Sequence, residues 1–414
     1  MSRSPDVVVI GGGVIGSAVA HYTARRGLFV TIIDQPKRGR ATSASAGGLW
    51  PLGESVGLGC GVIFYKTLLA KGGGPHGTNG GPAQLPRAFL DFAIASNAMF
   101  PRLAEELREA NGIDIEYERT ALLFLMYDEG DEAFARPLWQ SCPCGRTLTD
   151  WLTPEEVARE EPYLTGELRG ALRFRGDDQV NPYRLANALL TAARAHGATV
   201  LPHTEVVGLA RSGRRITGVR IKDRTIPCGT VVNAAGAWAG EIGAMAGLEI
   251  PVRPVRGQIV ATETLPKILS ACISTTACYL AQKGHGEVII GSTTEEAGFN
   301  VGVTAEAIAS LSAGAVRAVP FLGEVTIKRV WAGLRPGSPD ELPILGPVDG
   351  LDGYLNACGH FRTGILNAPL TGLVIAELAA GERPSQPIEP FLLSRFGRRL
   401  SSASSAAPTM IPLQ

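Results

Sequence analysis

The stretch DVVVIGGGVIGSAVAHYTARRGLFVTIID, residues 6–34, decides the fold. Its apolar run at residues 7–10 ends in glycines, which is typical of a strand buried on both faces of a parallel sheet. Apolar residues then recur at helical spacing until RRG at residues 25–27 supplies a helix stop. A second apolar run at residues 29–33 completes a βαβ unit with a right-handed crossover. The sequence therefore predicts an α/β protein with a Rossmann-like nucleotide-binding unit.

The glycines of this unit fit the pattern GxGxxG between a strand and a helix. Gly11 permits a tight turn, Gly13 lets a pyrophosphate approach the backbone, and Gly16 allows close packing of helix on strand. Asp34 follows the second strand and is expected to hold the adenosine ribose hydroxyls. The alternative is a glycine-rich turn beside an ordinary strand-end aspartate. The dinucleotide contacts predicted for the turn and the helix start are Gly11, Gly13, Val14, Ile15 and Gly16.

The 414 residues, with 45% hydrophobic content, are too many for one compact core and indicate two interleaved domains with a shared interface. The charges balance at 39 Lys+Arg against 39 Asp+Glu, so we expect no nucleic-acid partner. Polar and chain-breaking residues precede the first strand where a secretion signal would need a long apolar run. No segment approaches the ~20 apolar residues that span a bilayer. We expect a cytoplasmic protein, associated with the inner face of the membrane at most peripherally.

The seven cysteines are an odd number scattered over a long chain, unlike the dense even framework of a small secreted domain. We therefore expect reduced thiols. Cys142 and Cys144 form a CxC pair, but two further ligands at zinc-like spacing are missing, and no metal site is predicted. Cys60 and Cys358 are expected to be small apolar filler, with the tuning of a second cofactor at a subunit junction as the alternative.

Further along the chain, some apolar patterns favour strands of the parallel, nucleotide-binding sheet and others favour a separate antiparallel sheet. Residues 182–195 favour a helix with Pro in its first turn, followed by a strand at 199–201 and a hairpin. Residues 231–236 repeat an apolar strand that runs into small residues, as a second close approach to a nucleotide requires. Residues 250–330 contain alternating runs that suit an antiparallel sheet. Residues 71–82, with six glycines and two prolines, are predicted to be a flexible loop that orders only against a partner.

The predicted substrate domain begins with helical periodicity over residues 86–110 and a helix over residues 154–161 capped by Thr153. The tail at residues 401–414 is rich in Ser, Ala and Pro and is expected to be disordered. The predicted domains are a discontinuous nucleotide-binding domain of residues 1–60, 165–245 and 331–395, and a substrate-binding domain of residues 85–164 and 250–330.

Five blocks in order along the chain carry a family resemblance: GGGVIG, GRATSASAGGLW, NAAGAWA, WAGLRPGSPDELPILGP and GHFRTGIL. Over roughly residues 6–395, they resemble the D-amino-acid oxidase superfamily, especially its glycine oxidase and sarcosine oxidase branch. The resemblance implies an FAD-binding domain of the glutathione-reductase type with an inserted, mainly antiparallel β-sheet substrate domain. It also favours FAD over NAD, because no second nucleotide fingerprint or nicotinamide-domain pattern appears.

A second set of blocks narrows the branch: ASAGGLWPLGESVGLGCGVIF, AQKGHGEVIIGSTTE, PGSPDELPILGP and YLNACGHFRTGIL. These are similar to flavoprotein subunits of hydrogen cyanide synthase (cyanide-forming glycine dehydrogenase), D-hydroxyproline dehydrogenase and opine oxidase. The resemblance implies a heteromeric dehydrogenase with a ferredoxin-like small subunit and a second flavoprotein-like subunit. This chain has no iron-sulfur cysteine pattern, so a [2Fe-2S] cluster or a second flavin is expected only on or with partner subunits.

The family pattern implies FAD contacts from four segments of the chain. The segment of residues 42–48 lines the pyrophosphate and the flavin ring, and Val206 meets the adenine through its backbone. The segment of residues 235–238 closes over the phosphates. Backbone amides of Gly364 and Ile365 face the flavin pyrimidine. The alternative for the small residues is close packing of strand on helix. The implied contacts are Thr42, Ser43, Ala46, Gly47, Gly48, Val206, Ala235, Gly236, Trp238, Gly359, Phe361, Gly364 and Ile365, with Arg335 at the flavin edge.

Arg335 matches the arginine that grips the substrate carboxylate in the glycine oxidase branch. A guanidinium binds a carboxylate bidentately and so fixes the Cα–H over flavin N5. The alternative is a structural ion pair with Asp340 or Glu341. Tyr279 matches a substrate-site tyrosine of that branch.

His360 and Arg362 are further catalytic candidates in the loop near the flavin, where His360 could equally be a satisfied buried histidine. Ala277 and Thr294 stand where glycine oxidase has a histidine and a methionine, so the implied pocket has changed. Sarcosine oxidases attach flavin through a cysteine shortly after the arginine, but residues 336–347 contain none. Noncovalent FAD is therefore expected.

These observations favour an enzyme that oxidises the Cα–N bond of a small amino or imino acid, glycine or a D-amino acid, by hydride transfer to flavin. The amine must be neutral for hydride to leave, so activity is expected to rise toward the substrate's amine pKa. A free-standing glycine or sarcosine oxidase, a non-catalytic FAD-binding relay subunit and an NAD-dependent dehydrogenase are the alternatives.

Overall fold

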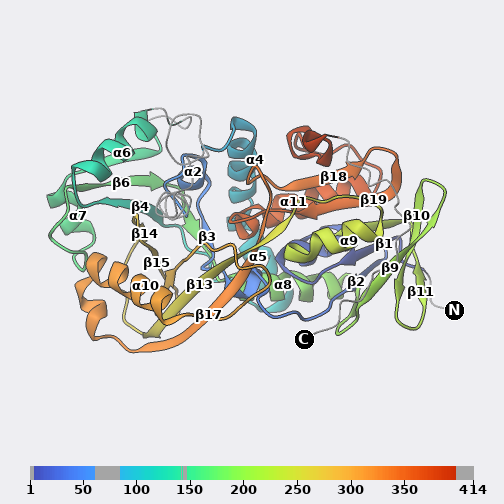
Figure 1. Cartoon of the computed structure of the whole chain (residues 1–414), viewed down its shortest axis with the longest axis horizontal. Helices are drawn as coiled ribbons and strands as arrows, with labels where there is room; N and C mark the ends of the chain where they lie inside the picture. Colours follow the sequence, from blue (N-terminus) through green and yellow to red (C-terminus); the bar gives the residue numbers. More distant parts are fainter. Residues whose placement is uncertain (1–3, 61–83, 141, 143–146, 398–414) are drawn as a thin grey trace, which may run out of the picture.

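The computed structural model describes residues 4–60, 84–140, 142 and 147–397. The predicted loop at 71–82 and tail at 401–414 therefore lie outside the described residues. Two large sheets lie side by side along the long axis of the molecule, with helices packed on their faces and between them (Figure 1). No helix of the described residues is long and apolar enough to cross a membrane.

The first sheet has nine strands in the order β11-β10-β19-β12-β1-β2-β8, with β9 paired to β10 and β18 paired to β19. β1 (Val7–Ile10) pairs in parallel with β2 and β12, and its four residues are buried, as the apolar run predicts. The other strands are β2 (Val30–Ile33), β8 (Thr199–Leu201), β9 (Val206–Ser212), β10 (Arg215–Ile221), β11 (Thr225–Pro227), β12 (Thr230–Asn233), β18 (Ile344–Val348) and β19 (Leu351–Cys358).

Helices on one face of this sheet bury a shared core with it. Gly372 lets two of these helices, α1 and α11, approach closely, because a Cβ there would lie 2.7 Å from the carbonyl carbon of Ala18. On the opposite face, α9 shares a second core with β1 and with the hairpin formed by β9 and β10. The helices of this sheet are α1 (Val14–Arg25), α8 (Pro182–Ala195), α9 (Ala239–Met245) and α11 (Gly364–Ala379).

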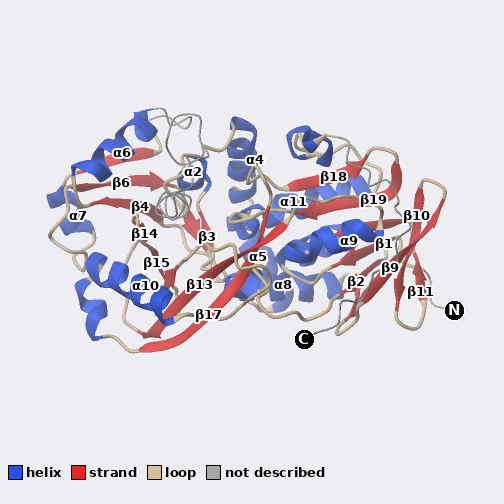
Figure 2. Ribbon diagram, in the orientation of Figure 1, coloured by secondary structure: helices blue, strands red, loops and turns tan. Residues whose placement is uncertain are grey.

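The second sheet has eight strands in the order β17-β13-β16-β15-β14-β4-β6-β5 and is antiparallel except where β14 pairs with β4 (Figure 2). Its strands are β4 (Ala121–Met126), β5 (Thr149–Leu152), β6 (Gly170–Arg175), β13 (Arg253–Thr264), β14 (Cys272–Ser274), β15 (Tyr279–Gln282), β16 (Glu287–Gly291) and β17 (Ile327–Gly337). Its helices are α6 (Glu129–Gln140), α7 (Pro154–Glu160) and α10 (Ala305–Ala318). The parallel sheet with a separate, mainly antiparallel sheet confirms the predicted fold class.

Three predicted domain assignments need correction. α4 (Arg87–Asn97) and α5 (Phe100–Asn111), assigned to the substrate domain, bury Phe89 and Phe100 in the core of the parallel sheet, because their apolar faces pack on α11 and α8. β6 and the end of β17, assigned to the nucleotide domain, belong to the antiparallel sheet, because they pair with β4 and β13. The boundaries predicted at residues 165 and 331 therefore shift by one strand each.

Short elements connect the two sheets. Thr153 caps the start of α7, as predicted from the sequence, and it forms a capping box with Glu156. β3 pairs with β7. The short elements are β3 (Gly48–Leu49), β7 (Asp178–Gln179), α2 (Pro51–Ser55) and the 3-10 helices η1 (Thr42–Ala44), η2 (Gly236–Trp238), η3 (Pro320–Glu324), η4 (Glu389–Phe391) and η5 (Leu393–Phe396).

The cysteines only partly follow the prediction of reduced thiols. Cys142 is disulfide-bonded, so the prediction is wrong there, and its neighbour Cys144 lies outside the described residues. The odd number and scattered positions of the seven cysteines, on which the prediction rested, do not exclude a single disulfide. Free thiols are found at Cys60, Cys228, Cys272, Cys278 and Cys358.

Candidate active site

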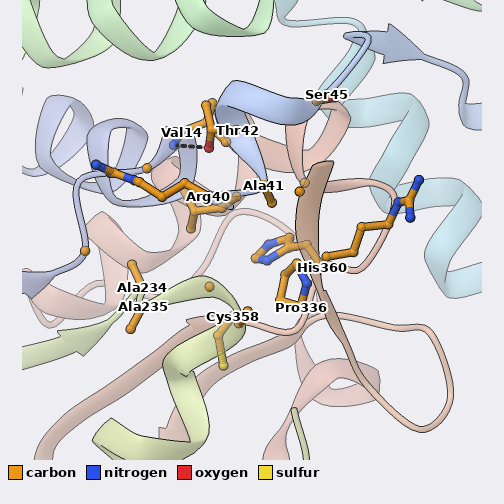
Figure 3. Close-up of a pocket in the computed structure, with 18 of the residues that line it drawn as sticks. Val14, Arg40, Ala41, Thr42, Ser45, Ala234, Ala235, Pro336, Cys358 and His360 are labelled. Atoms are coloured by element: carbon orange, nitrogen blue, oxygen red, sulfur yellow. Dashed lines mark hydrogen bonds between the residues drawn. The ribbon is translucent and has the colours of Figure 1, made fainter. Parts of the chain in front are cut away.

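One pocket is lined by residues at the carboxyl ends of the parallel strands and by residues of the antiparallel sheet. Figure 3 shows part of its lining. The pocket collects residues from widely separated segments, because the crossovers bring the turn after β1, the segment after η1, η2 and the loop before α11 to the same edge. The predicted site residues that line it are Gly11, Gly13, Val14, Ile15, Asp34, Thr42, Ala46, Gly47, Gly48, Val206, Ala235, Gly236, Trp238, Tyr279, Arg335, His360, Phe361, Arg362, Gly364 and Ile365.

The turn between β1 and α1 is built for close approach. Gly11 has φ +108°, and a Cβ there would lie 2.4 Å from the carbonyl oxygen of Ala234. A Cβ at Gly16 would lie 1.8 Å from the Gly11 carbonyl oxygen, so Gly16 serves helix packing and does not line the pocket. No side chain caps α1, although the Val14 N–H donates to the Thr42 hydroxyl at 3.0 Å. The remaining N–H groups of this helix start are free to bind an anion.

Asp34 lies at the end of β2, where it accepts a 2.7 Å hydrogen bond from the Gly12 N–H. The guanidinium of Arg40 donates to both of its carboxylate oxygens, at 2.9 and 3.1 Å. Arg40 also lines the pocket, and sequence reasoning missed it. Its signal in the sequence is its place in the block GRATSASAGGLW, beside the small and hydroxyl residues that the resemblance implies as contacts.

The wall opposite α1 is formed by the segment after β12. Gly236 has φ +56° and open space where a Cβ would project. Trp238 stacks on Phe299, with ring centroids 5.5 Å apart, and Lys37 lies 5.1 Å from its ring centre. Trp238 therefore joins the nucleotide end of the pocket to the segment between β16 and α10.

A second helix start faces the pocket at its other end. α11 begins at Gly364, and the Thr363 hydroxyl does not cap it but donates to the carbonyl of His360 at 2.9 Å. Gly364, Ile365 and Leu366 line the pocket, so free N–H groups of the helix start are available there. Such donors match the carbonyl-bearing edge of a flavin ring.

Besides Gly16, two predicted contacts lie outside the pocket lining, Ser43 and Gly359. Ser43 is exposed, and its hydroxyl donates to the carbonyl of Arg40 at 3.1 Å, whereas Ser45 lines the pocket instead. Ser43 lies within the 3-10 helix η1, whose turn carries it away from the pocket. Gly359 has φ +71°, and its conformation turns the chain between β19 and the His360 loop.

Arg335 lies where the pocket meets the antiparallel sheet. It comes from β17 and crosses Gly257 of β13, where a Cβ would lie 2.2 Å from its Nη1. Nη1 donates to the carbonyl of Thr293 at 3.1 Å, and Nη2 donates to the Ser292 hydroxyl. Within the described residues no carboxylate pairs with Arg335.

Asp340 and Glu341, the acids that could have formed a structural ion pair with Arg335, have other partners. Asp340 pairs with Arg395 at 2.7 Å, and Glu341 pairs with Arg362 at 2.8 Å. The guanidinium of Arg335 is therefore a cation in a pocket without an acidic partner among the residues that the structure describes. Such a group favours an anionic ligand.

Tyr279 from β15 is buried beside this arginine, and burial raises the pKa of its phenol. Trp50 packs edge-on against the Tyr279 ring, with centroids 5.6 Å apart. Both rings line the pocket, and sequence reasoning missed Trp50, whose tryptophan in the block ASAGGLW was a visible signal. Ala277 and Thr294 do not line the pocket, so they do not set its shape directly.

His360 is buried, and its Nε2 lies 3.0 Å from the Thr371 hydroxyl of α11. Burial lowers the pKa of its imidazole to about 3, so the ring is neutral at physiological pH. This arrangement supports the satisfied buried histidine and gives no support to a proton-transfer role.

Arg362 is 3% exposed at its side chain and pairs with Glu54 at 3.1 Å and with Glu341 at 2.8 Å. Burial alone would lower the pKa of Arg362, but the carboxylates of Glu341 and Glu54 outweigh it and raise that pKa. Its charge is compensated, unlike that of Arg335. Nη1 is buried without a hydrogen-bond partner in the described structure. Glu54 also lines the pocket and was missed by sequence reasoning, although it stands in the block ASAGGLWPLGESVGLGCGVIF, because its ion pair with Arg362 forms only in the folded chain.

These residues fit FAD. A pocket with two uncapped helix starts and an aspartate at the end of the second strand matches a dinucleotide whose ring system reaches a second sheet. Gly236 leaves open space where a side chain would otherwise project.

Comparisons with known proteins agree with this geometry. The family model for FAD dependent oxidoreductases, DAO, matches residues 6–378. The hydrogen cyanide synthase subunit HcnC of Pseudomonas aeruginosa is 49% identical over 416 residues, covering 98% of this chain and 100% of the relative. Glycine oxidase from Geobacillus kaustophilus is 32% identical over 400 residues, covering 95% of this chain and 98% of the relative.

Solved structures give the same result. The crystal structure of glycine oxidase from Geobacillus kaustophilus superposes with a TM-score of 0.83 at 31% identity, covering 95% of this chain and 99% of that chain. L-proline dehydrogenase from P. horikoshii superposes with a TM-score of 0.80 at 27% identity, covering 96% and 98%. The chain belongs to the DAO family and is an FAD-dependent oxidoreductase.

Proposed function

We propose that this chain oxidises the Cα–N bond of a small amino or imino acid, glycine or a D-amino acid. The single observation that carries the proposal is the guanidinium of Arg335, which lies in the cofactor pocket without an acidic partner among the described residues. A bidentate interaction with the substrate carboxylate would satisfy that charge. FAD, when bound, supplies the hydride acceptor.

The protein's own residues orient the substrate and exclude water. Arg335 holds the carboxylate, and its hydrogen bonds to Ser292 and Thr293 fix the guanidinium plane. Tyr279 and Trp50 form an apolar wall that limits the size of the substrate. His360, neutral and bound to Thr371, supports the loop before α11. Because hydride leaves from the neutral amine, turnover should rise with pH toward the amine pKa.

The FAD contacts of this site are also proposals. Asp34 with Arg40 would hold the adenosine ribose, the start of α1 with Thr42 the pyrophosphate, and the start of α11 the flavin pyrimidine. No cysteine stands in residues 336–347, which supports noncovalent attachment.

We further propose that the chain works as the flavoprotein subunit of a heteromeric cytoplasmic dehydrogenase such as hydrogen cyanide synthase, at most peripherally bound to a membrane. The support is the 49% identity to a hydrogen cyanide synthase subunit over nearly the whole of both chains. Electrons would then pass to an iron-sulfur cluster or second flavin on a partner.

Anaerobic flavin reduction tests the proposed chemistry. The purified holoprotein is mixed with glycine, sarcosine, D-alanine and D-proline, and bleaching of the flavin absorption is followed. We expect at least one substrate to bleach the wild type, and Arg335→Lys to need a much higher concentration at unchanged FAD content. A non-catalytic relay subunit would be bleached by none.

The electron acceptor is tested on the same protein. We expect substrate-reduced flavin to pass electrons to an artificial dye faster than to air, and co-purification to recover a cluster-bearing small protein. Peroxide production at the rate of dye reduction would indicate a free-standing oxidase.

A further inference from the structure

Glu54 is a buried carboxylate at the substrate end of the pocket, with no role in the chemistry described above. It is 4% exposed, lies at the end of the short helix α2, and lines the same pocket as Arg335 and Tyr279. Burial of an ionised carboxylate is costly unless charges and donors satisfy it. The hydrogen-bond donors around Glu54 therefore show how much of its acceptor capacity is still unsatisfied.

The hydrogen-bond partners of Glu54 leave part of its acceptor capacity free. Oε1 accepts the backbone N–H of Cys60 at 2.8 Å, and Oε2 accepts Nε of Arg362 at 3.1 Å. The Cys60 thiol also hydrogen-bonds to this carboxylate. A carboxylate has about four lone-pair sites, so about one remains for another donor. Arg362 is not a dedicated partner, because it also pairs with Glu341 at 2.8 Å.

The charges at this end of the pocket match a zwitterion. Arg362 is shared by two carboxylates, Glu54 and Glu341, while Arg335 has no carboxylate partner among the described residues. The four groups therefore present one excess positive site at Arg335 and one excess negative site shared by the two glutamates. Only Glu54 of the two glutamates lines the pocket. A ligand with a carboxylate and an ammonium would compensate both sites.

We propose that Glu54 is the acceptor for the ammonium group of the substrate, opposite the carboxylate that Arg335 binds. This inference rests on the proposed function and specifies its ligand as an α-amino acid that binds as the zwitterion, with two charged anchors at fixed positions. Loss of one ammonium proton to the Glu54 carboxylate then gives the neutral amine from which hydride leaves. Two anchors set the orientation of the Cα–H bond, which a single carboxylate contact leaves free to rotate.

The test compares glycine with acetate, which differs by the missing amino group. Acetate affinity is measured by its perturbation of the flavin spectrum, and glycine affinity by the concentration dependence of anaerobic flavin reduction. In Glu54→Gln holoprotein we expect the Kd for glycine to rise about tenfold or more, since a hydrogen bond loses its charge assistance. The Kd for acetate should stay constant or fall, because a nearby negative charge is gone.

Glu341→Gln is the matched control, because it removes the other partner of Arg362 from outside the pocket lining. We expect it to leave the ratio of the two Kd values unchanged. A proportional rise of both Kd values in Glu54→Gln and in Glu341→Gln would show that Glu54 acts only through Arg362 and would overturn the inference.

If Glu54→Gln yields no folded holoprotein, Glu54→Asp is measured in the same way. It keeps the charge but withdraws the carboxylate by one methylene, so the inference predicts a selective loss of glycine affinity, and an equal loss of both affinities contradicts it. Failure of the proposed function is distinct, because wild-type flavin would then be reduced by no amino acid.

Discussion

Gly257→Ala displaces the guanidinium of Arg335 without changing its chemistry. A Cβ at this position would lie 2.2 Å from Nη1 and 2.5 Å from Cζ. Non-bonded carbon contacts settle near 3.5 Å, so the guanidinium must move by about 1.3 Å. Gly257 lies within β13 outside the left-handed region, so the backbone accepts alanine. A misplacement of about 1 Å can cost about 100-fold in rate, and we expect a loss of that order in kcat/KM.

The assay is dye reduction with saturating FAD, together with acetate affinity from the flavin spectrum. FAD content should match the wild type, because the displaced group belongs to the substrate end. Gly166→Ala is the control, since a Cβ there meets nothing within 4 Å. If Gly257→Ala binds acetate and turns over like the wild type, Arg335 does not hold the substrate carboxylate.

Three further predictions test the cofactor end and the buried histidine. Acid precipitation should release all yellow colour, because no cysteine stands at residues 336–347, and flavin on the washed pellet would contradict noncovalent attachment. Thr42→Val, which removes the acceptor of the Val14 N–H, should weaken FAD binding by about tenfold, measured by titration of the apoprotein, while Thr42→Ser should not. The His360 pKa is lowered from 6.5 to about 3, so its contribution to stability is complete above pH 6.5 and is lost as the pH falls toward 3. Urea midpoints from pH 7 to 5 should therefore fall less steeply for His360→Gln, by up to ~1.4 kcal/mol per pH unit in unfolding free energy, and equal slopes would refute the burial argument.

The local patterns of the sequence predicted the parallel-sheet unit well. The apolar run of β1, the helical spacing of α1 and the glycine turn are all encoded within a few neighbouring residues, and the structure has each of them. The antiparallel sheet was likewise visible in the alternation over residues 250–330.

Long-range packing was the part that the sequence could not supply. α4 and α5 are amphipathic helices whose sequences do not say which sheet receives their apolar faces. The last residues of β17 were assigned to the nucleotide domain, yet the register of β17 with β13 is set by pairing across many residues. Glu54 and Arg40 were missed for the same reason, because their roles depend on ion pairs with residues brought close only by the fold.

In the proposed function, the Cα–H bond of a small amino acid breaks at this pocket with its carboxylate on Arg335. The most direct measurement is the rate of anaerobic flavin reduction by the best substrate of the panel and by the same compound deuterated at Cα. The account predicts a saturating reduction that is slower with deuterium in the wild type, and that needs far more substrate in Arg335→Lys. A flavin that no small amino or imino acid reduces, or a reduction that Arg335→Lys leaves unchanged, would contradict it.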